Sequence, residues 1–350
     1  MSFQNIIDQV SMYSPIYDPK SYERENEDDD KIFYENARFV QHVDSLALQT
    51  IEEVIGTLIV EKNPVILDLM AGWDSHIPSS LTPEKLIGLG LNEEELTNNT
   101  LLDEYVIHDL NKDPHLPFPD CYFDVVLNTL SIAYITNPIQ IFKEVGRILK
   151  PGGLFLVIFS NRMFEPKATK LWKAASEDER IIIVDELFKE TSFFTKAKVF
   201  VSRGKPRPKN DKYASYGIPS DPIYAVYSDR IGGDSNKIRP DIKLSFLKFP
   251  SKEELEERME KVKDTLRCPY CDEELKKWQV PENPFCQTWD NEYMYICFND
   301  SCPYYVRGWD RMYQETFQNM SYRLMFNPTN GRCSPIPVPT PYALKEGIIQ

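Results

Sequence analysis

The 350-residue sequence has no apolar run approaching the roughly 20 residues that a membrane-spanning helix needs. Its first ten residues, MSFQNIIDQV, lack the basic and then apolar pattern of a secretory signal, so we expect a cytoplasmic protein without membrane association. Basic residues are also in deficit, since 40 Lys and Arg stand against 54 Asp and Glu and the formal net charge is −14. This balance disfavours nucleic acid as a partner, because binding to its backbone depends on clustered positive charge.

Cysteine is scarce over most of the chain, and six of the seven cysteines lie between residues 268 and 333. An odd number in a chain without an export signal favours metal ligation over disulfides. Two close pairs, C-x₂-C and C-x₄-C, consist of Cys268, Cys271, Cys297 and Cys302. They predict a tetrahedral Cys₄ zinc site in a zinc-ribbon-like module, and a closed site of this kind is structural. Cys286 and Cys333 have no close partner, and either could replace one of the four.

Residues 117–160 carry the strongest structural pattern. An apolar run at 123–127 leads into an amphipathic helix at 138–149, and a Pro-Gly-Gly break at 151–153 precedes a second apolar run at 154–160. A short buried strand, a helix and another buried strand predict a βαβ unit of a parallel sheet.

The flanking sequence extends this sheet. Residues 44–60 have helical apolar spacing with Asp44 as N-cap, and helical residues are also expected between 171 and 187. The loop 203–222 is rich in Gly, Pro, Lys and Asn and is expected to be mobile. Further strands are predicted at 65–69, 85–89, 105–108, 197–202 and 223–227, the last two as an antiparallel hairpin.

The sequence of these segments resembles that of a known family. L-P-F-x-D-x-x-F-D-V-V followed by I-L-K-P-G-G is similar to the core of type 11 class I methyltransferases that use S-adenosylmethionine. R-F-V-x-H-x-D at 38–44, with D-L-M-A-G-W-D-S-H-I-P at 68–78, resembles a subset whose first loop lacks the usual glycines. Residues 33–230 carry the resemblance, which implies an α/β fold with a Rossmann-like seven-stranded sheet.

The resemblance implies a cofactor site with two departures. Met70 and Asp74 stand where glycines are usual in the first loop. Gly90 takes the place of the acid that normally grips the ribose, and Asn92 or Glu93 could partly substitute for it. The positions that match or neighbour the family's cofactor-binding residues are Asp68, Gly72, Trp73, Asn92, Asp109, Leu110, Asn128, Thr129 and Leu130.

Within this set the resemblance gives Asp109 the adenine amino group as its partner, with Leu110 packed beside it. Trp73 could equally be a core or a lid residue. Asp74 could face a ligand, although a helix N-cap is the simpler interpretation.

Catalytic residues are less well indicated. His42 and His76 are candidate bases, although a histidine is more often a hydrogen-bonded structural residue. Tyr134 follows the fourth strand and is expected in the wall of the substrate pocket. Methyl transfer needs a base only when the acceptor must lose a proton.

The chain divides into five predicted parts. The acidic run at 25–30 is expected to be solvated, and Ser251 with Glu254 predicts a capping box. Prolines at 334–341 predict an extended polyproline tail lying across a surface. The parts are an arm or lid (1–35), a methyltransferase-like domain (36–230), a linker and helix (231–266), the zinc-ribbon-like module (267–330) and a Pro-rich tail (331–350).

Three functions follow from these features. The leading hypothesis is S-adenosylmethionine-dependent methylation of a small-molecule acceptor, with zinc in a structural module that covers or extends the site. The alternatives are methylation of a macromolecule that the zinc ribbon recognises, and a non-catalytic interaction protein, which Met70, Asp74 and Gly90 would favour. A zinc-bound thiolate that accepts a methyl group is a further alternative, and a homo-oligomer is compatible with the sequence.

Overall fold

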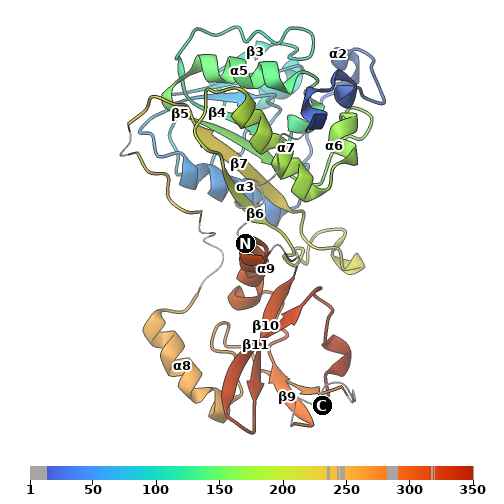
Figure 1. Ribbon diagram of the computed structural model, residues 1–350, viewed down its shortest axis with the longest axis vertical. Coiled ribbons are helices and arrows are strands. Elements are labelled where there is room, and N and C mark those ends of the chain that lie inside the picture. The colour runs from blue at the N-terminus through green and yellow to red at the C-terminus, as the bar shows by residue number, and fades with distance from the viewer. Residues whose placement is uncertain are drawn as a thin grey trace. The chain divides into compact units, whose positions relative to one another are not determined.

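The computed structural model describes residues 14–234, 237–242, 244, 249–281, 291–316, 318 and 320–349. They form two compact units, which Figure 1 shows as ribbons. The sheet unit comprises the described residues among 14–201 and 221–243. The C-terminal unit comprises residues 202–220 and the described residues from 244 onward. Cys286 lies outside the described residues.

The sheet unit contains the predicted seven-stranded sheet. Its strands are β1 (Val65–Leu69), β2 (Lys85–Gly90), β3 (Glu104–Ile107), β4 (Phe123–Thr129), β5 (Leu149–Phe159), β6 (Lys198–Ser202) and β7 (Ile223–Asp229). The strand order is β3-β2-β1-β4-β5-β7-β6. Strands β1 to β5 pair in parallel, and β7 runs antiparallel to β5. The α/β fold expected from the sequence is therefore confirmed.

The strand order reverses direction beside β1. From β1 the chain first adds β2 and β3 on one side, and then returns to add β4 and β5 on the other. Parallel strands of this kind are buried on both faces, which explains the apolar runs of β1, β4 and β5. In open α/β sheets, ligands bind outside the carboxyl ends of the strands at such a switch point.

Helices flank the sheet. They are η1 (Ser14–Tyr17), η2 (Pro19–Tyr22), α2 (Asp30–Phe33), α3 (Ser45–Leu58), α4 (Glu93–Asn98), η3 (Ile132–Tyr134), α5 (Pro138–Ile148), α6 (Lys170–Ala174) and α7 (Glu177–Glu190). Helices α5 and α7 lie together over the sheet (Figure 1). The rings of Phe142, Phe155 and Phe188 pack there with centroids 4.8 to 5.3 Å apart. The helical residues expected near 171–187 form two helices, because Ser176 begins a new one with a capping box.

Strand β5 differs from its prediction. The Pro-Gly-Gly segment was expected to form a turn before the strand, but β5 already begins at Leu149 and includes this segment. Phe123 pairs with Leu149 and Val125 with Leu154, so the extra residues form an irregularity in the register. Gly152 has φ of +75°, a conformation that glycine adopts without strain.

The acidic run of the N-terminal arm is only partly solvated. Glu25, Glu27 and Asp28 are exposed, as expected, but Asp30 is only 4% exposed. Arg24 donates two hydrogen bonds to Asp30, at 2.9 and 2.8 Å, and the Lys167 ammonium lies 2.9 Å away. Burial alone would raise the pKa of Asp30, but these hydrogen bonds lower it. The prediction of a solvated run is therefore wrong at its last residue.

The C-terminal unit is built around a second sheet. Its elements are η4 (Ala214–Tyr216), α8 (Lys252–Thr265), β8 (Lys276–Gln279), β9 (Tyr293–Ile296), α9 (Pro303–Thr316), β10 (Ser321–Asn327), β11 (Arg332–Val338) and η5 (Lys345–Gly347). The strand order is β11-β10-β9-β8, and the pairs are antiparallel. Ser251 caps α8 by accepting a hydrogen bond from the Glu254 N–H.

The proline-rich tail is a strand rather than a free polyproline segment. Residues Arg332–Val338 form β11, which pairs with β10 at the edge of the sheet. Pro335 and Pro337 are two residues apart in β11, so their backbone nitrogens face the same side of the strand. The N–H groups that proline lacks are therefore missing from that side alone. An edge strand tolerates this loss because its outer side has no neighbour.

The segment between β6 and β7, expected to be a mobile loop, packs within the C-terminal unit. Gly204, with φ of +71°, lies against the ring of Trp309, where a Cβ atom would approach to 2.3 Å. The adjacent Asp310 is buried, which raises its pKa to about 6, and it accepts a hydrogen bond from the Arg203 N–H. At the far end of the segment, the Tyr342 hydroxyl donates to the Gly217 carbonyl oxygen at 2.5 Å.

None of the described helices is both long and apolar enough to cross a lipid bilayer.

The N-cap of α3 provides a test of the sheet unit. Asp44 Oδ1 accepts from the N–H groups of Leu46 and Ala47, and Oδ2 accepts from the Asp221 N–H at 2.6 Å. Asp44→Ala should lower the free energy of unfolding by about 1–2 kcal/mol, because it removes the cap and leaves buried donors unpaired. Urea denaturation followed by circular dichroism measures this change.

Asp44→Asn is the matched control. Its side-chain oxygen can still cap α3, but its amide cannot accept the Asp221 N–H, so it should lose less than alanine does. An alanine variant as stable as the wild type would contradict the assigned role of Asp44.

Candidate functional site

A cavity of about 620 Å³ opens in the sheet unit at the carboxyl ends of β1, β2 and β4, where the strand order reverses. Segments that are far apart in the sequence meet there. The lining includes Asp30 and Tyr34, residues 40–42, Asp68, residues 70–74, His76, residues 89–92, Glu95, residues 108–111, residues 129–131, Tyr134 and residues 161–165. The segment that precedes α3 (residues 14–42), called the N-terminal arm from here on, thus forms one wall of a site whose floor is the sheet.

The first loop adopts backbone conformations that glycine usually provides. Met70 has φ of +66° and His76 has φ of +54°. Such values are uncommon for residues with a side chain and often occur at functional sites. Asp68, at the end of β1, is buried, which raises its pKa to about 6 although the Ser75 hydroxyl donates to it. The first loop therefore adopts the positive φ angles that glycine favours, although Met70 and His76 stand at these positions.

Gly72 and Trp73 occupy the turn of this loop. The Asn99 amide donates to the Gly72 carbonyl oxygen at 3.0 Å. The Trp73 indole N–H donates to the Val40 carbonyl oxygen at 3.2 Å, and its ring meets the edge of Phe39. Trp73 therefore connects the first loop to the N-terminal arm and is not a core residue.

At the end of β2 the backbone leaves no room for a side chain. A Cβ atom on Gly90 would lie 2.4 Å from the Ala71 carbonyl oxygen. Asn92 lines the cavity, but its amide donates to the carbonyl oxygens of Tyr34 and Glu35, at 2.7 and 3.0 Å. Its Oδ1 caps α4 by accepting from the Glu95 N–H. The Asn92 side chain therefore has a structural role, because it joins the arm to the start of α4.

Asp109 presents an acceptor oxygen without a hydrogen bond. It is 8% exposed, lines the cavity, and accepts from the Asn111 N–H through Oδ1 at 3.0 Å. Its Oδ2 is buried and accepts no hydrogen bond from the described part of the chain, although the Lys112 ammonium forms an ion pair with it at 3.8 Å. Leu110, which is buried, lines the cavity next to it. A buried carboxylate oxygen without a donor is costly unless a ligand supplies one.

Of the residues at the end of β4, some line the cavity and one holds the strands behind it together. Leu130 lines the cavity with φ of +58°, next to Thr129, whose buried hydroxyl has no hydrogen-bond partner among the described residues. Asn128, expected to contact the cofactor, is fully buried and lies outside the lining. Its amide donates to the Leu69 carbonyl oxygen at 3.2 Å and to the Ser131 hydroxyl at 2.9 Å. The structure thus places Asn128 as a clamp between β1 and β4.

An aspartate and a histidine form a pair in the cavity wall. His76 Nδ1 lies 3.1 Å from Asp74 Oδ2, and the His76 N–H donates to Asp74 Oδ1 at 2.9 Å. The hydrogen bond from the imidazole lowers the pKa of Asp74 to about 2. No helix begins at Asp74, so the N-cap interpretation is wrong.

The other two catalytic candidates also line the cavity. Burial lowers the pKa of His42, whose ring meets the edge of Phe164. The Tyr134 hydroxyl oxygen accepts from the Phe164 N–H at 2.8 Å, and burial raises the Tyr134 pKa to about 12. Tyr134 consequently keeps its proton at neutral pH.

The charge of the wall favours a positively charged ligand. Arg162 is the only Lys or Arg among the described residues that line the cavity. The carboxylates around it are Asp30, Asp68, Asp74, Glu95, Asp109 and Glu165. Arg24 and Lys167 compensate Asp30, but the remaining excess is negative.

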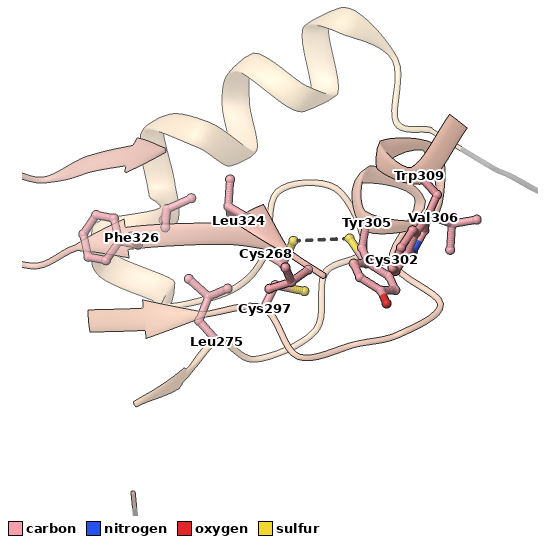
Figure 2. Packing of buried hydrophobic residues seen from close by; sticks show 11 residues of the cluster. Cys268, Leu275, Cys297, Cys302, Tyr305, Val306, Trp309, Leu324 and Phe326 are labelled. Atoms are coloured by element: carbon pink, nitrogen blue, oxygen red, sulfur yellow. Dashed lines mark hydrogen bonds between the residues drawn. The ribbon is translucent and has the colours of Figure 1, made fainter. Parts of the chain in front are cut away.

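The four predicted metal ligands lie together in the C-terminal unit. The sulfur atoms of Cys268, Cys271, Cys297 and Cys302 all lie within 4.8 Å of one another. Cys268 and Cys302 are 3.9 Å apart, and Cys271 and Cys297 are 3.6 Å apart. Figure 2 shows Cys268, Cys297 and Cys302 among the apolar side chains that surround them. Cys333 packs against the same core but is not one of the four.

Sequence reasoning missed Arg323, which supports this cluster. Its side chain is fully buried and donates to the Cys297 carbonyl oxygen at 3.2 Å and to Asp300 Oδ1 at 2.5 Å. The guanidinium also lies 4.2 Å from the centre of the Tyr305 ring. Its spacing in the sequence gave no signal of this role, because its partners are brought near only by the fold.

The solved structures with a similar fold match about half of the chain. One is a complex between the Trm112 methyltransferase activator of Haloferax volcanii and a methyltransferase, with 18% identity over 54% of this chain and 92% of that chain and a TM-score of 0.40. Another is an S-adenosylmethionine-dependent methyltransferase from Mesorhizobium loti, with 16% identity over 48% of this chain and 91% of that chain and a TM-score of 0.34.

Curated relatives match a shorter stretch. The ubiquinone/menaquinone biosynthesis C-methyltransferase UbiE of Laribacter hongkongensis is 31% identical over 103 residues, which is 28% of this chain and 41% of the relative. The malonyl-[acyl-carrier protein] O-methyltransferase of a Marinomonas species is 27% identical over 143 residues, 37% of this chain and 51% of the relative. The chain thus spans about half or less of these relatives. Residues 80–157, which include β2 to β4 and most of β5, match the family described as a methyltransferase domain.

Proposed function

We propose that the sheet unit binds S-adenosylmethionine in the cavity and transfers its methyl group to a small-molecule acceptor. The observation that carries this proposal is the cavity at the switch point of the sheet, with Asp109 Oδ2, which accepts no hydrogen bond from the described residues, in its wall. Its volume of about 620 Å³ lies in the range typical of cofactor and substrate sites. The match of residues 80–157 to a methyltransferase domain supports the same function.

The residues present fit this cofactor. Asp109 Oδ2 would accept a hydrogen bond from the adenine amino group, and Leu110 would pack beside the ring. The excess of carboxylates in the wall would stabilise a ligand that carries a sulfonium and an ammonium group. Gly72 exposes backbone at the centre of the first loop, where a side chain would narrow the cavity.

The cofactor would supply an electrophilic methyl group, and the protein would hold the acceptor in line with it. No covalent intermediate with the chain is needed, so the main tasks of the chain are positioning and the exclusion of water. The arm serves the second task, because Tyr34 and residues 40–42 form one wall of the cavity. Of the three catalytic candidates, His76 is the best base, since Asp74 orients its ring and leaves Nε2 to accept a proton.

We also propose that Cys268, Cys271, Cys297 and Cys302 bind a structural zinc ion. Tetrahedral coordination with Zn–S bonds of about 2.3 Å separates the sulfurs by about 3.8 Å. The observed separations of 3.9 and 3.6 Å fit this geometry. Four sulfurs close the coordination shell, which favours a structural role over methyl transfer to a thiolate. The ion would stabilise a unit whose core is small.

The Oδ2 oxygen of Asp109 provides the test of cofactor binding. Wild-type protein should bind S-adenosylhomocysteine, as isothermal titration calorimetry would show. Asp109→Asn should weaken binding by about 10- to 100-fold, because the amide can present a donor where the carboxylate accepted a charge-assisted hydrogen bond.

Asp113→Asn is the matched control for Asp109. Asp113 is exposed in the same loop and lies outside the cavity, so its affinity should equal that of the wild type. If the wild type failed to bind S-adenosylhomocysteine at millimolar concentration, the proposed methyltransferase function would be wrong.

The metal assignment predicts about one zinc ion per purified chain, measurable by mass spectrometry. Cys271→Ser should lower the zinc content and the melting temperature of the C-terminal unit, because it removes one of four ligands. Treatment of the wild type with a strong chelator should have the same effect.

Cys333→Ser makes the same change on a cysteine of the same core. It should retain the full zinc content, since Cys333 lies outside the group of four sulfurs. Loss of zinc from this variant and not from Cys271→Ser would contradict the assignment of the ligands.

A further inference from the structure

The end of β2 cannot carry the acid that a nucleoside site of this kind usually has there. In open α/β sheets, an acidic residue near this strand end hydrogen-bonds the ribose hydroxyls. The Ala71 N–H donates to the Leu89 carbonyl oxygen at 2.8 Å, which draws the first loop against β2. Any Cβ atom at Gly90 would then meet the Ala71 carbonyl oxygen at 2.4 Å. The missing side chain is thus a consequence of backbone packing.

The two substitutes suggested by the sequence are not available. All the polar atoms of the Asn92 side chain are engaged, with the arm and with the first turn of α4. Glu93 is exposed, lies outside the cavity lining, and accepts from the Tyr105 hydroxyl at 3.4 Å. Asn92 is thus held by the arm and the cap of α4, and Glu93 does not face the cavity.

The remaining acid is Glu95, which lies two residues after Glu93 in α4. It lines the cavity, and its Oε1 accepts from the Arg38 N–H at 2.7 Å. Its Oε2 has no hydrogen bond from the described residues and lies 3.1 Å from the place where Gly72 would carry a Cβ atom. The carboxylate is therefore fixed through one oxygen, while the other faces the turn of the first loop.

The surroundings keep this carboxylate in place. The Arg38 guanidinium stacks on the rings of Phe33, Tyr34 and Phe164, at 4.9, 5.4 and 5.3 Å from their centres. It also donates to the Phe33 carbonyl oxygen, so the backbone that holds Glu95 is itself anchored. Burial raises the pKa of Glu95, and the Arg38 N–H and charge oppose this shift.

We propose that Glu95 replaces the strand-end acid and accepts hydrogen bonds from the ribose hydroxyls of the cofactor. The inference rests on the proposed function, since it assigns a residue to the same cofactor. Gly72 is part of the arrangement, because a Cβ atom there would lie 3.1 Å from Glu95 Oε2 and crowd it.

The test compares two ligands on the full-length protein by calorimetry: S-adenosylhomocysteine and its 2′,3′-dideoxy analogue. The wild type should prefer the ligand with hydroxyls by about 10- to 100-fold, the range for hydrogen bonds to a charged group. Glu95→Gln should lose most of this preference while binding the dideoxy analogue as the wild type does. The glutamine oxygen can still accept the Arg38 N–H, so the arm should stay anchored.

Glu94→Gln removes a neighbouring charge from the same turn of α4, where Glu94 is exposed and outside the cavity. It should leave both affinities unchanged. A Glu95→Gln variant that weakens both ligands equally would show a purely structural role and overturn the inference. Equal binding of the two ligands by the wild type would also overturn it, yet leave the methyltransferase proposal intact. Only a wild type that binds neither ligand would overturn both.

Discussion

The contact between the backbone of Ala71 and the end of β2 is the constraint on which the site depends. The Ala71 N–H binds Leu89, and its carbonyl oxygen excludes any side chain from Gly90. Polar groups near this strand end are therefore supplied by α4, through Asn92 and Glu95. Both residues also hold the N-terminal arm. This backbone contact thus leaves the polar groups at this strand end to come from α4.

Buried charges position the arm more than they stabilise it. Taking Asp30, Arg24 and Lys167 out of water costs free energy that their mutual attraction largely offsets. What the group provides is specificity, since an arm shifted along its length would leave a charge buried without a partner. Arg323 acts in the same way in the C-terminal unit, where its contacts with Asp300 and Cys297 determine the course of the loop around the sulfurs.

The elements with a strong local pattern could be predicted from the sequence. The bounds of β1 and the Asp44 cap of α3 follow from apolar spacing and capping chemistry, and the cysteine pairs from their short spacing. The burial of Asp30 could not be predicted, because Lys167 is distant in the sequence. Glu95 was missed because a charged residue in a short helix carries no sign of the cavity it faces. The tail became a strand because its edge position, set by tertiary pairing, suits proline.

Residues 202–220 have a consequence for how this protein can change during evolution. They lie between two strands of the sheet unit in the sequence, yet Gly204 packs on Trp309 and Arg203 contacts Asp310. A gene shortened to end near residue 243 would keep residues 202–220 and lose helix α9, on which they pack. Recombination that exchanged the C-terminal unit alone would pair the segment with a foreign surface. An exchange of the C-terminal unit that keeps its packing must therefore carry residues 202–220 with it.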